Sequence, residues 1–182
     1  MSEEAVKPGD VVGFWRSIGP KGWFEKNQAV DDEIRRLFLG IHEEAAAGKL
    51  SAWENSAEGA LALLILLDQF PRNMFRGDRR AFATDAQARA VASRAILRGF
   101  DGAFPDMRSF FYLPFEHSEN LADQERGLAL YKAAADADGL KWAQTHYDII
   151  KKFGRFPHRN AALGRVTTPE EQKFLDDGGF AG

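Results

Sequence analysis

The sequence predicts an all-α fold: a single domain of about six or seven helices arranged in antiparallel pairs. Three observations support this prediction: apolar residues recur at helical spacing, helix start signals are frequent, and strand-like alternation is almost absent. The length of 182 residues suits one domain with one sizeable core. We expect the domain to span residues 1–182, with an irregular start over 1–25 and a frayed tail over 176–182.

The first long helix is predicted from about Val30 to Ala47. Its apolar residues recur every three or four positions, as expected for one buried face, and Gly48 suits the position just after a helix. These apolar residues are Ile34, Leu37, Phe38 and Ile41.

Two capping boxes mark the next helices. In such a box a Ser or Thr and a Glu or Gln three residues later cap the same helix start. Ser51–Glu54 opens a helix that we expect to continue to Gln69, and Thr84–Gln87 opens another that ends near Gly99. The apolar face of this second helix contains Ala88, Val91, Ala92, Ala95 and Ile96.

The second half of the chain is also predicted to be helical. Residues 104–115 are aromatic and contain two prolines, which indicates a loop or a short helix packed over the core. Ser118 is the predicted N-cap of a helix that runs to about Asp138, and a further helix covers residues 140–153. Thr168–Glu171 combines a capping box with proline at the first helical position, which is a clear start signal.

Composition and charge exclude several classes of protein. Hydrophobic residues make up 45% of the chain and charged residues 28%, the balance of a soluble globular protein. A formal net charge of -3 argues against binding to nucleic acid, which needs a basic face. The chain has no cysteine, so disulfides, thiol catalysis and Cys-based metal sites are excluded, and we expect no cofactor.

Two features bear on location. The longest apolar run, Ala60 to Leu67, is far shorter than the roughly 20 residues that span a bilayer, so we expect no membrane association. No basic segment followed by an apolar one is visible near the N-terminus, so nothing there indicates a signal peptide. A cytoplasmic location is therefore the expectation.

The first polar motif, Asp68-Gln-Phe-Pro-Arg-Asn73, follows the most apolar helix. Because Phe70 precedes a proline, we expect it to leave the α region, which places Asp68 in the last helical turn. A buried carboxylate there faces the negative end of the helix dipole and needs a cation or several N–H donors. A structural salt bridge is the preferred interpretation, and a catalytic carboxylate is the alternative. The candidate cations are Arg72, Arg76, Arg155 and Arg159.

The second polar motif is Glu116-His-Ser-Glu119, followed by Asp123. If Ser118 caps the next helix, Glu119 and Asp123 lie one turn apart on one face, with His117 just before them. Such oxygen and imidazole groups could bind a metal ion, but acids also gather in first turns because the helix dipole favours them there. No metal-binding spacing such as HExxH is present, so we predict no metal site.

The third polar motif is Arg155-Phe-Pro-His-Arg-Asn160, with Arg165 beyond it. Arginine guanidinium groups beside an amide and a histidine could bind a phosphate or carboxylate ligand. They could equally pair with Asp68, Glu119 or Asp123 of the same chain. By contrast, His42 and His146 lie inside predicted helices, and we interpret them as surface or half-buried packing residues.

These motifs resemble the signature stretches of a bacterial domain-of-unknown-function family, number 924. They read "LLDQFPRNMFRGDRRAFATD", "LPFEHSENLADQE" and "FGRFPHRNAALGRVTTPEE", and Phe14-Trp15 and Trp23-Phe24 fit the usual opening of the family. The resemblance covers nearly the whole chain and implies an all-helical, TPR-like fold, but no established activity, ligand or catalytic residue. The residues that it carries over are Asp68, Gln69, Arg72, Asn73, His117, Ser118, Glu119, Asp123, Gln124, Arg155, His158, Arg159 and Asn160.

The leading hypothesis for function is a helical binding module whose polar cluster receives a peptide, a protein or a small anionic ligand. It rests on the three polar motifs, which we expect to converge on one region, in a chain without a complete catalytic signature. The alternatives are a small hydrolase or transferase with Asp68 or His117 as general base, and motifs that are purely structural. The predicted ligand-binding residues are Asp68, Gln69, Arg72, Asn73, Arg76, His117, Glu119, Asp123, Arg155, His158, Arg159 and Asn160.

Overall fold

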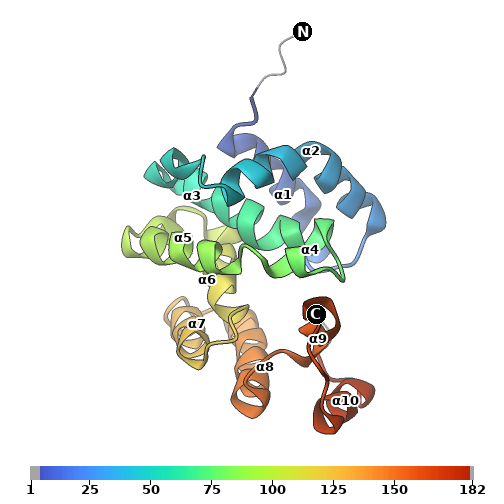
Figure 1. The fold of residues 1–182 in the computed structure, drawn as a ribbon. Coiled ribbons are helices and arrows are strands. Elements are labelled where there is room, and N and C mark those ends of the chain that lie inside the picture. The colour runs from blue at the N-terminus through green and yellow to red at the C-terminus, as the bar shows by residue number, and fades with distance from the viewer. Residues whose placement is uncertain (1–4, 181–182) are drawn as a thin grey trace. The chain divides into compact units, whose positions relative to one another are not determined.

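A computed structural model describes residues 5–180 of the chain. These residues form helices without any β-strand, which confirms the all-α prediction over the described range, and the number of helices is about as expected. The chain divides into two compact units (Figure 1). One unit contains the residues up to Arg76 and Arg80–Pro114, and the other contains Gly77–Arg79 and the residues from Phe115 onward. The single-domain boundary and the TPR-like likeness stay predictions.

The first unit packs its helices around an aromatic core. The Phe70 ring lies 5.6 Å from the Trp15 ring and 4.9 Å from the Phe38 ring, and Phe110 also packs on Trp15. The elements, of which η3 and α6 cross unit boundaries, are α1 (Pro8–Gly22), α2 (Gln28–Ala46), η1 (Ser51–Asn55), α3 (Ala57–Leu64), η2 (Ile65–Gln69), α4 (Phe70–Met74), η3 (Arg79–Phe82), α5 (Asp85–Leu97), η4 (Phe100–Ala103), η5 (Pro105–Met107) and α6 (Ser109–Glu116).

The irregular start predicted over residues 1–25 is wrong for α1. Pro8 occupies the first helical position, where its missing N–H needs no partner, and the helix then buries Trp15 completely. Gly19 has a φ of 78°, which interrupts the helix, and Pro20 follows in a new turn. The Gly-Pro pair therefore marks a kink between two helical stretches.

Two predicted capping boxes do not form in the first unit. Ser51–Glu54 forms the 3-10 helix η1, and α3 begins only after Ser56, whose hydroxyl accepts a hydrogen bond from the Gly59 N–H at 3.1 Å. Thr84 precedes α5 as predicted, but its hydroxyl donates to the Leu67 carbonyl at 2.5 Å. Neither Ser51 nor Thr84 therefore caps a helix with its side chain, as the local pattern had suggested.

The helical segment from Ala57 to Met74 is continuous, which contradicts the predicted end at Gln69. Phe70 keeps helical angles, with φ of -58° and ψ of -36°, although it precedes Pro71. The turn before Pro71 is a π-helix, η2, in which the Phe70 N–H donates to the Ile65 carbonyl. A wider turn accommodates the proline ring, which would otherwise clash with the carbonyl four residues earlier.

Three side chains donate to the carbonyl groups of this π-turn. Pro71 has no N–H, so the carbonyls that precede it by four and five residues lose their usual donor. His42 Nδ1 lies 2.8 Å from the Leu66 carbonyl, and the Thr84 hydroxyl donates to Leu67. The Asp68 carbonyl accepts from Arg72 Nη1 at 2.6 Å. The buried carbonyls of this proline-containing helix therefore accept hydrogen bonds from side chains of α2 and α4 and of the residue just before α5.

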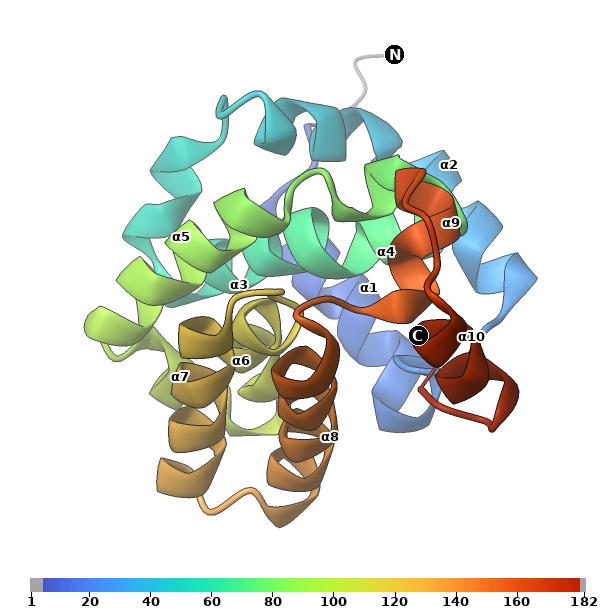
Figure 2. The ribbon, with the colours of Figure 1, turned by 60° about the horizontal axis from the view of Figure 1, so that its bottom comes forward.

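The second unit contains a helical hairpin followed by short helices. Helices α7 (Leu121–Ala133) and α8 (Ala137–Phe153) lie side by side (Figure 2). Beyond them follow η6 (Pro157–Arg159), α9 (Asn160–Leu163) and α10 (Pro169–Asp176). The predicted helix over residues 140–153 is confirmed within α8. The Thr168–Glu171 capping box is also confirmed, with Thr168 Oγ1 accepting from the Glu171 N–H at 3.2 Å.

The boundaries of α7 and the C-terminal tail need correction. Asn120, and not Ser118, caps α7, because the Ser118 hydroxyl donates to the Asp123 carboxylate at 2.7 Å. The helix ends at Ala133 rather than Asp138, since Ala135 adopts a positive φ of 53°. In the predicted frayed tail, α10 continues to Asp176, and the Phe180 ring packs within the unit. Residues 181 and 182 lie outside the described range.

In the described part of the chain, every helix is too short or too polar to cross a membrane.

The π-turn account predicts that the Thr84 hydroxyl stabilises the fold. Thr84→Val should lower the free energy of unfolding by about 1–3 kcal/mol, because the buried Leu67 carbonyl would lose its donor. In a Pro71→Ala background the same substitution should cost less, since the new N–H can donate to that carbonyl. Urea denaturation of the four proteins of this cycle measures both effects.

Thr145→Val is the matched control for this cycle. The Thr145 hydroxyl also donates to a backbone carbonyl, that of Lys141 at 3.2 Å, but at an exposed position. Its loss should change the free energy of unfolding by less than about 0.5 kcal/mol. Equal costs for Thr84→Val with and without the Pro71→Ala substitution would contradict the account.

Candidate functional site

The first polar motif forms a buried network in the first unit. Asp68 is 1% exposed and lies in η2, inside the helical segment, so the predicted position in a last helical turn is wrong. Its carboxylate accepts from Gln69 Nε2 at 2.6 Å and lies 3.3 Å from Arg72 Nη1. Arg72 also holds both carboxylate oxygens of Asp85, at 3.0 and 3.1 Å. Burial opposes the charge on Arg72, but the two aspartates outweigh it and raise its pKa.

The rest of this motif binds a carboxylate that the sequence did not single out. Arg76 Nε and Nη2 donate to Asp31 at 2.5 and 3.0 Å, and Asn73 Nδ2 donates to the same carboxylate at 2.8 Å. Asp31 lies in the first turn of α2 and is 4% exposed. Three candidate ligand groups in this motif, Arg72, Asn73 and Arg76, are thus occupied by the acids of α2 and α5.

His42 supports the structural interpretation of the first unit. Its ring is buried between α2 and η2, and burial lowers its pKa, although the bond to the Leu66 carbonyl acts in the opposite direction. Since a carbonyl can only accept, Nδ1 carries the proton of the neutral ring. His42 packs inside a helix as predicted, but it is buried rather than at the surface or half-buried, and it has the added role of a donor to the π-turn.

In the second unit, two arginines of the third motif region are held by glutamates. Arg155 forms a bidentate ion pair with Glu171, with N–O distances of 2.6 and 2.8 Å. Arg165 forms another with Glu119, with N–O distances of 2.8 and 2.9 Å. Burial opposes ionisation of Glu119, but Arg165 and the Phe156 N–H outweigh it, so its pKa lies below the ordinary value. Glu171 was predicted only as a capping residue.

Three of the four histidines of the chain gather in the second unit. His146 of α8 lies 6.4 Å from His117 between ring centroids, and the Phe180 ring contacts both His146, at 4.5 Å, and His158, at 5.3 Å. Phe156 lies against His146 and His158 on another side, at 5.5 and 5.6 Å. We name His117, His146 and His158 the histidine cluster.

Arg159 adjoins the histidine cluster. Its guanidinium lies 4.5 Å from the centre of the Phe156 ring, and Nη2 donates to the His117 carbonyl at 3.0 Å. The side chain is buried, with 6% of the residue exposed. The second and third polar motifs therefore meet in this unit, as predicted. Whether the first motif shares that region stays a prediction.

A carboxylate that the sequence did not assign lies beside the cluster. Glu116 Oε1 is 2.9 Å from His146 Nδ1, and both residues are buried. Glu116 Oε2 has no hydrogen-bond partner among the described residues, and the same is true of the Gln124 and Asn160 amide oxygens. Buried acceptors of this kind are uncommon. No group of three or more His, Cys, Asp or Glu side chains in residues 5–180 could hold a metal ion.

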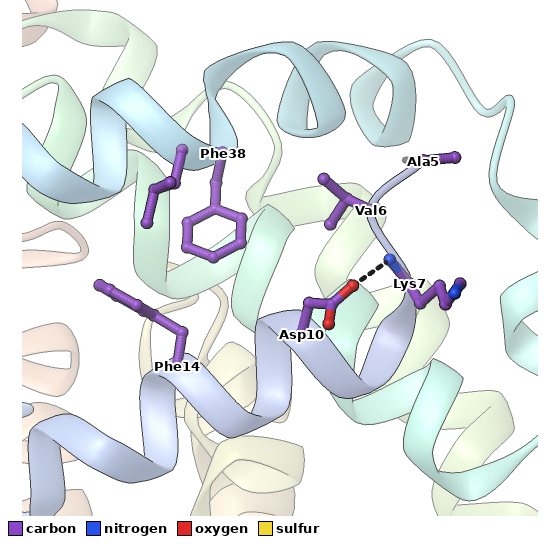
Figure 3. A pocket seen from close by; sticks show the side chains of 7 residues that line it. Ala5, Val6, Lys7, Asp10, Phe14 and Phe38 are labelled. Carbon is purple, nitrogen blue, oxygen red and sulfur yellow. Dashed lines mark hydrogen bonds between the residues drawn. The ribbon is translucent and has the colours of Figure 1, made fainter. Parts of the chain in front are cut away.

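A hollow in the first unit is lined by other residues. It has a volume of about 480 Å³ and lies between α1 and α2, where the Phe14 and Phe38 rings and the Val6 side chain face it (Figure 3). Its polar rim is formed by Lys7 and Asp10, whose carboxylate accepts from the Lys7 N–H at 2.8 Å. None of the twelve predicted ligand-binding residues lines this hollow.

The Arg72 network predicts a large loss of stability when the cation is removed. Arg72→Ala should lower the free energy of unfolding by about 3–5 kcal/mol, because Asp68 and Asp85 would stay buried without it. Arg94→Ala is the control, since Arg94 binds Glu54 with the same two-pronged geometry but is 56% exposed. Its loss should cost about 0–1 kcal/mol. Equal urea midpoints for the two variants would contradict the buried network.

Because the pKa of Glu171 is lowered in the folded protein, we expect its contribution to stability to depend on pH. The Arg155 guanidinium and the Thr168 N–H hold the pKa of Glu171 at about 2, below its ordinary value of 4.5, although burial acts against ionisation. Because the folded pKa is the lower one, this contribution is present above about pH 4.5 and is lost as the pH falls toward 2. The stability gap between the wild type and Glu171→Gln should therefore narrow between about pH 5 and 3.

Glu170→Gln is the control for this pH series, because Glu170 is 69% exposed and lies 3.4 Å from the similarly exposed Lys152. Urea melts at several pH values should show no comparable trend for Glu170→Gln. A gap for Glu171→Gln that stays constant over the same pH range would mean that the Arg155 pair does not stabilise the folded state.

Comparison with known proteins identifies the family of the chain. The family described as "Bacterial protein of unknown function (DUF924)" matches residues 11–179. A solved structure of a protein of unknown function from Agrobacterium tumefaciens is 47% identical, with a TM-score of 0.90, and the match covers 94% of this chain and 97% of that one. No curated protein matches. The match over nearly the whole chain confirms the resemblance noted in the sequence, and the chain belongs to the bacterial family of unknown function DUF924.

Proposed function

We propose that the chain is a helical binding module whose ligand site lies at the histidine cluster and Arg159 of the second unit. The ligand is a small molecule that carries an oxyanion, either a phosphate or a carboxylate. One observation carries the proposal: three of the four histidines are brought together beside a buried arginine, from segments as far apart as residues 117 and 158. A cytoplasmic location, as expected from the sequence, is part of this proposal.

The chemistry of the cluster suits an oxyanion. Imidazole is the side chain that most readily changes charge between about pH 5 and 8, and both of its nitrogens donate when it is protonated. Arginine adds a permanent charge, and hydrogen bonds to a charged group contribute about 1.5–3 kcal/mol each. His117 and His158 are half-buried, so a ligand there would be partly shielded from water.

Four other arginines of the polar motifs are less suited to an external anion. Arg72, Arg76, Arg155 and Arg165 each hold a carboxylate of the same chain. An external anion would have to displace that carboxylate, and a displaced buried carboxylate is costly. Asp68, one of the two general bases that the sequence suggested as an alternative, is less suitable, since it is 1% exposed and already bound by Gln69 and Arg72.

Anion titration tests the proposal. Phosphate or a small carboxylate should raise the melting temperature in a saturable way at low salt, and isothermal titration calorimetry should give a matching dissociation constant. His158→Asn should weaken binding about tenfold, which corresponds to the loss of one charge-assisted hydrogen bond. Added sodium chloride should weaken binding as well, since screening acts over roughly 8–10 Å near physiological ionic strength.

Lys173→Gln is the matched control for this titration. It removes one positive charge from the same unit, at a residue that is 75% exposed and bound to Asp177. Binding should be unchanged in this variant. The proposal is wrong if phosphate, carboxylates and acidic peptides all fail to give a saturable shift at low salt, or if Lys173→Gln weakens binding as much as His158→Asn.

A further inference from the structure

The Glu116–His146 pair has the geometry of an oriented imidazole. His146 Nδ1 lies 2.9 Å from Glu116 Oε1 and 2.9 Å from the Trp142 carbonyl, so both neighbours of this nitrogen are acceptors. Nδ1 must therefore carry a proton, and in the neutral ring the lone pair lies on Nε2. Among residues 5–180, no hydrogen-bond partner occupies Nε2. This nitrogen is available to a ligand or a water molecule at the histidine cluster.

The surroundings of His146 come from several elements of the second unit. Glu116 is the last residue of α6 and His117 follows it, while His158 belongs to η6. The Phe156 and Phe180 rings cover two further sides of the imidazole. Glu116 is the acid in contact with the ring, and it is 3% exposed, so its charge is poorly screened by water.

We propose that His146 is a general base that activates a water molecule for hydrolysis of a small carboxylic ester bearing an anionic group. This inference rests on the proposed function, because Arg159 and His158 would hold the anionic group of the substrate. A carboxylic ester suits the site, since a water molecule with one proton acceptor can attack its carbonyl carbon directly.

The reaction needs only His146, the substrate and one water molecule. His146 Nε2 takes one proton from water as the water oxygen forms a bond to the carbonyl carbon. The bond between that carbon and the alcohol oxygen then breaks, and the imidazolium returns its proton to the departing alcohol. The products are a carboxylic acid and an alcohol, and no oxidant or reductant is required.

Glu116 is a positioning residue in this reaction. Its Oε1 fixes the tautomer that leaves Nε2 basic, and its charge stabilises the imidazolium that forms when His146 takes up the proton. The second oxygen, Oε2, is buried without a partner among the described residues, so one carboxylate oxygen is committed to His146 and the other is not bound to a second cation there.

The test uses the p-nitrophenyl half-ester of succinic acid, whose hydrolysis is followed by nitrophenolate absorbance. The wild type should hydrolyse it with saturation kinetics, and His146→Asn should lower kcat/KM by about 100-fold or more, the usual effect of losing a general base. Lys173→Gln should leave the rate unchanged. Melting curves and circular dichroism establish that each variant is folded.

Glu116→Gln separates positioning from simple packing. The amide keeps the shape of the side chain but removes the charge that stabilises the imidazolium. Glu116→Gln should therefore lower kcat for the half-ester while leaving KM unchanged, because Glu116 acts through His146 and does not touch the substrate. An unchanged kcat, or a change in KM alone, would contradict the role of Glu116.

Nitrogen NMR of the wild-type imidazoles gives a test that does not depend on any variant. At mildly alkaline pH, His146 should show a proton on Nδ1 and a bare Nε2, and the opposite tautomer would overturn the proposal. If phosphate binds but the half-ester is not hydrolysed above the buffer rate, the general base is wrong and the binding function stands. If neither occurs, both proposals fail.

Discussion

A proline inside a buried helix is the constraint on which much of the first unit depends. Pro71 has no N–H and its ring needs room, so the helix widens into the π-turn η2 and the neighbouring carbonyls require other donors. These donors are His42 of α2, Thr84 just before α5, and Arg72 of α4. Because these three side chains bind the same turn, they fix how α2, α4 and the start of α5 pack around the segment from Ala57 to Met74.

We infer different roles for the two polar regions. In the first unit, the acids that neutralise Arg72 and Arg76 belong to the helices that pack on η2, which makes the network part of the architecture. In the second unit, the arginines at 155 and 165 are likewise neutralised, and Glu116 is paired with His146 of the histidine cluster. We propose that this cluster, beside Arg159, is the ligand site.

Local patterns predicted the helices well and the ionic partners poorly. Gly48 and Gly99 follow helices with positive φ as their positions suggested. By contrast, Arg76 pairs with Asp31, which lies 45 residues earlier, and no local signal links the two. His146 was interpreted as a packing residue because a helical position does not reveal which carboxylate another helix places beside it. The π-turn was missed because the rule for residues before proline assumes an ordinary α-helix.

We propose that the polar motif around Asp68 serves the fold and that the histidine cluster serves a ligand. A residue-resolved NMR titration of the isotope-labelled protein with phosphate at low salt tests it most directly. The account predicts saturable shift changes at His117, His146, His158 and Arg159, with the Asp68–Asn73 stretch unchanged. Saturable changes centred on Asp68–Asn73, with the histidine cluster unaffected, would contradict it.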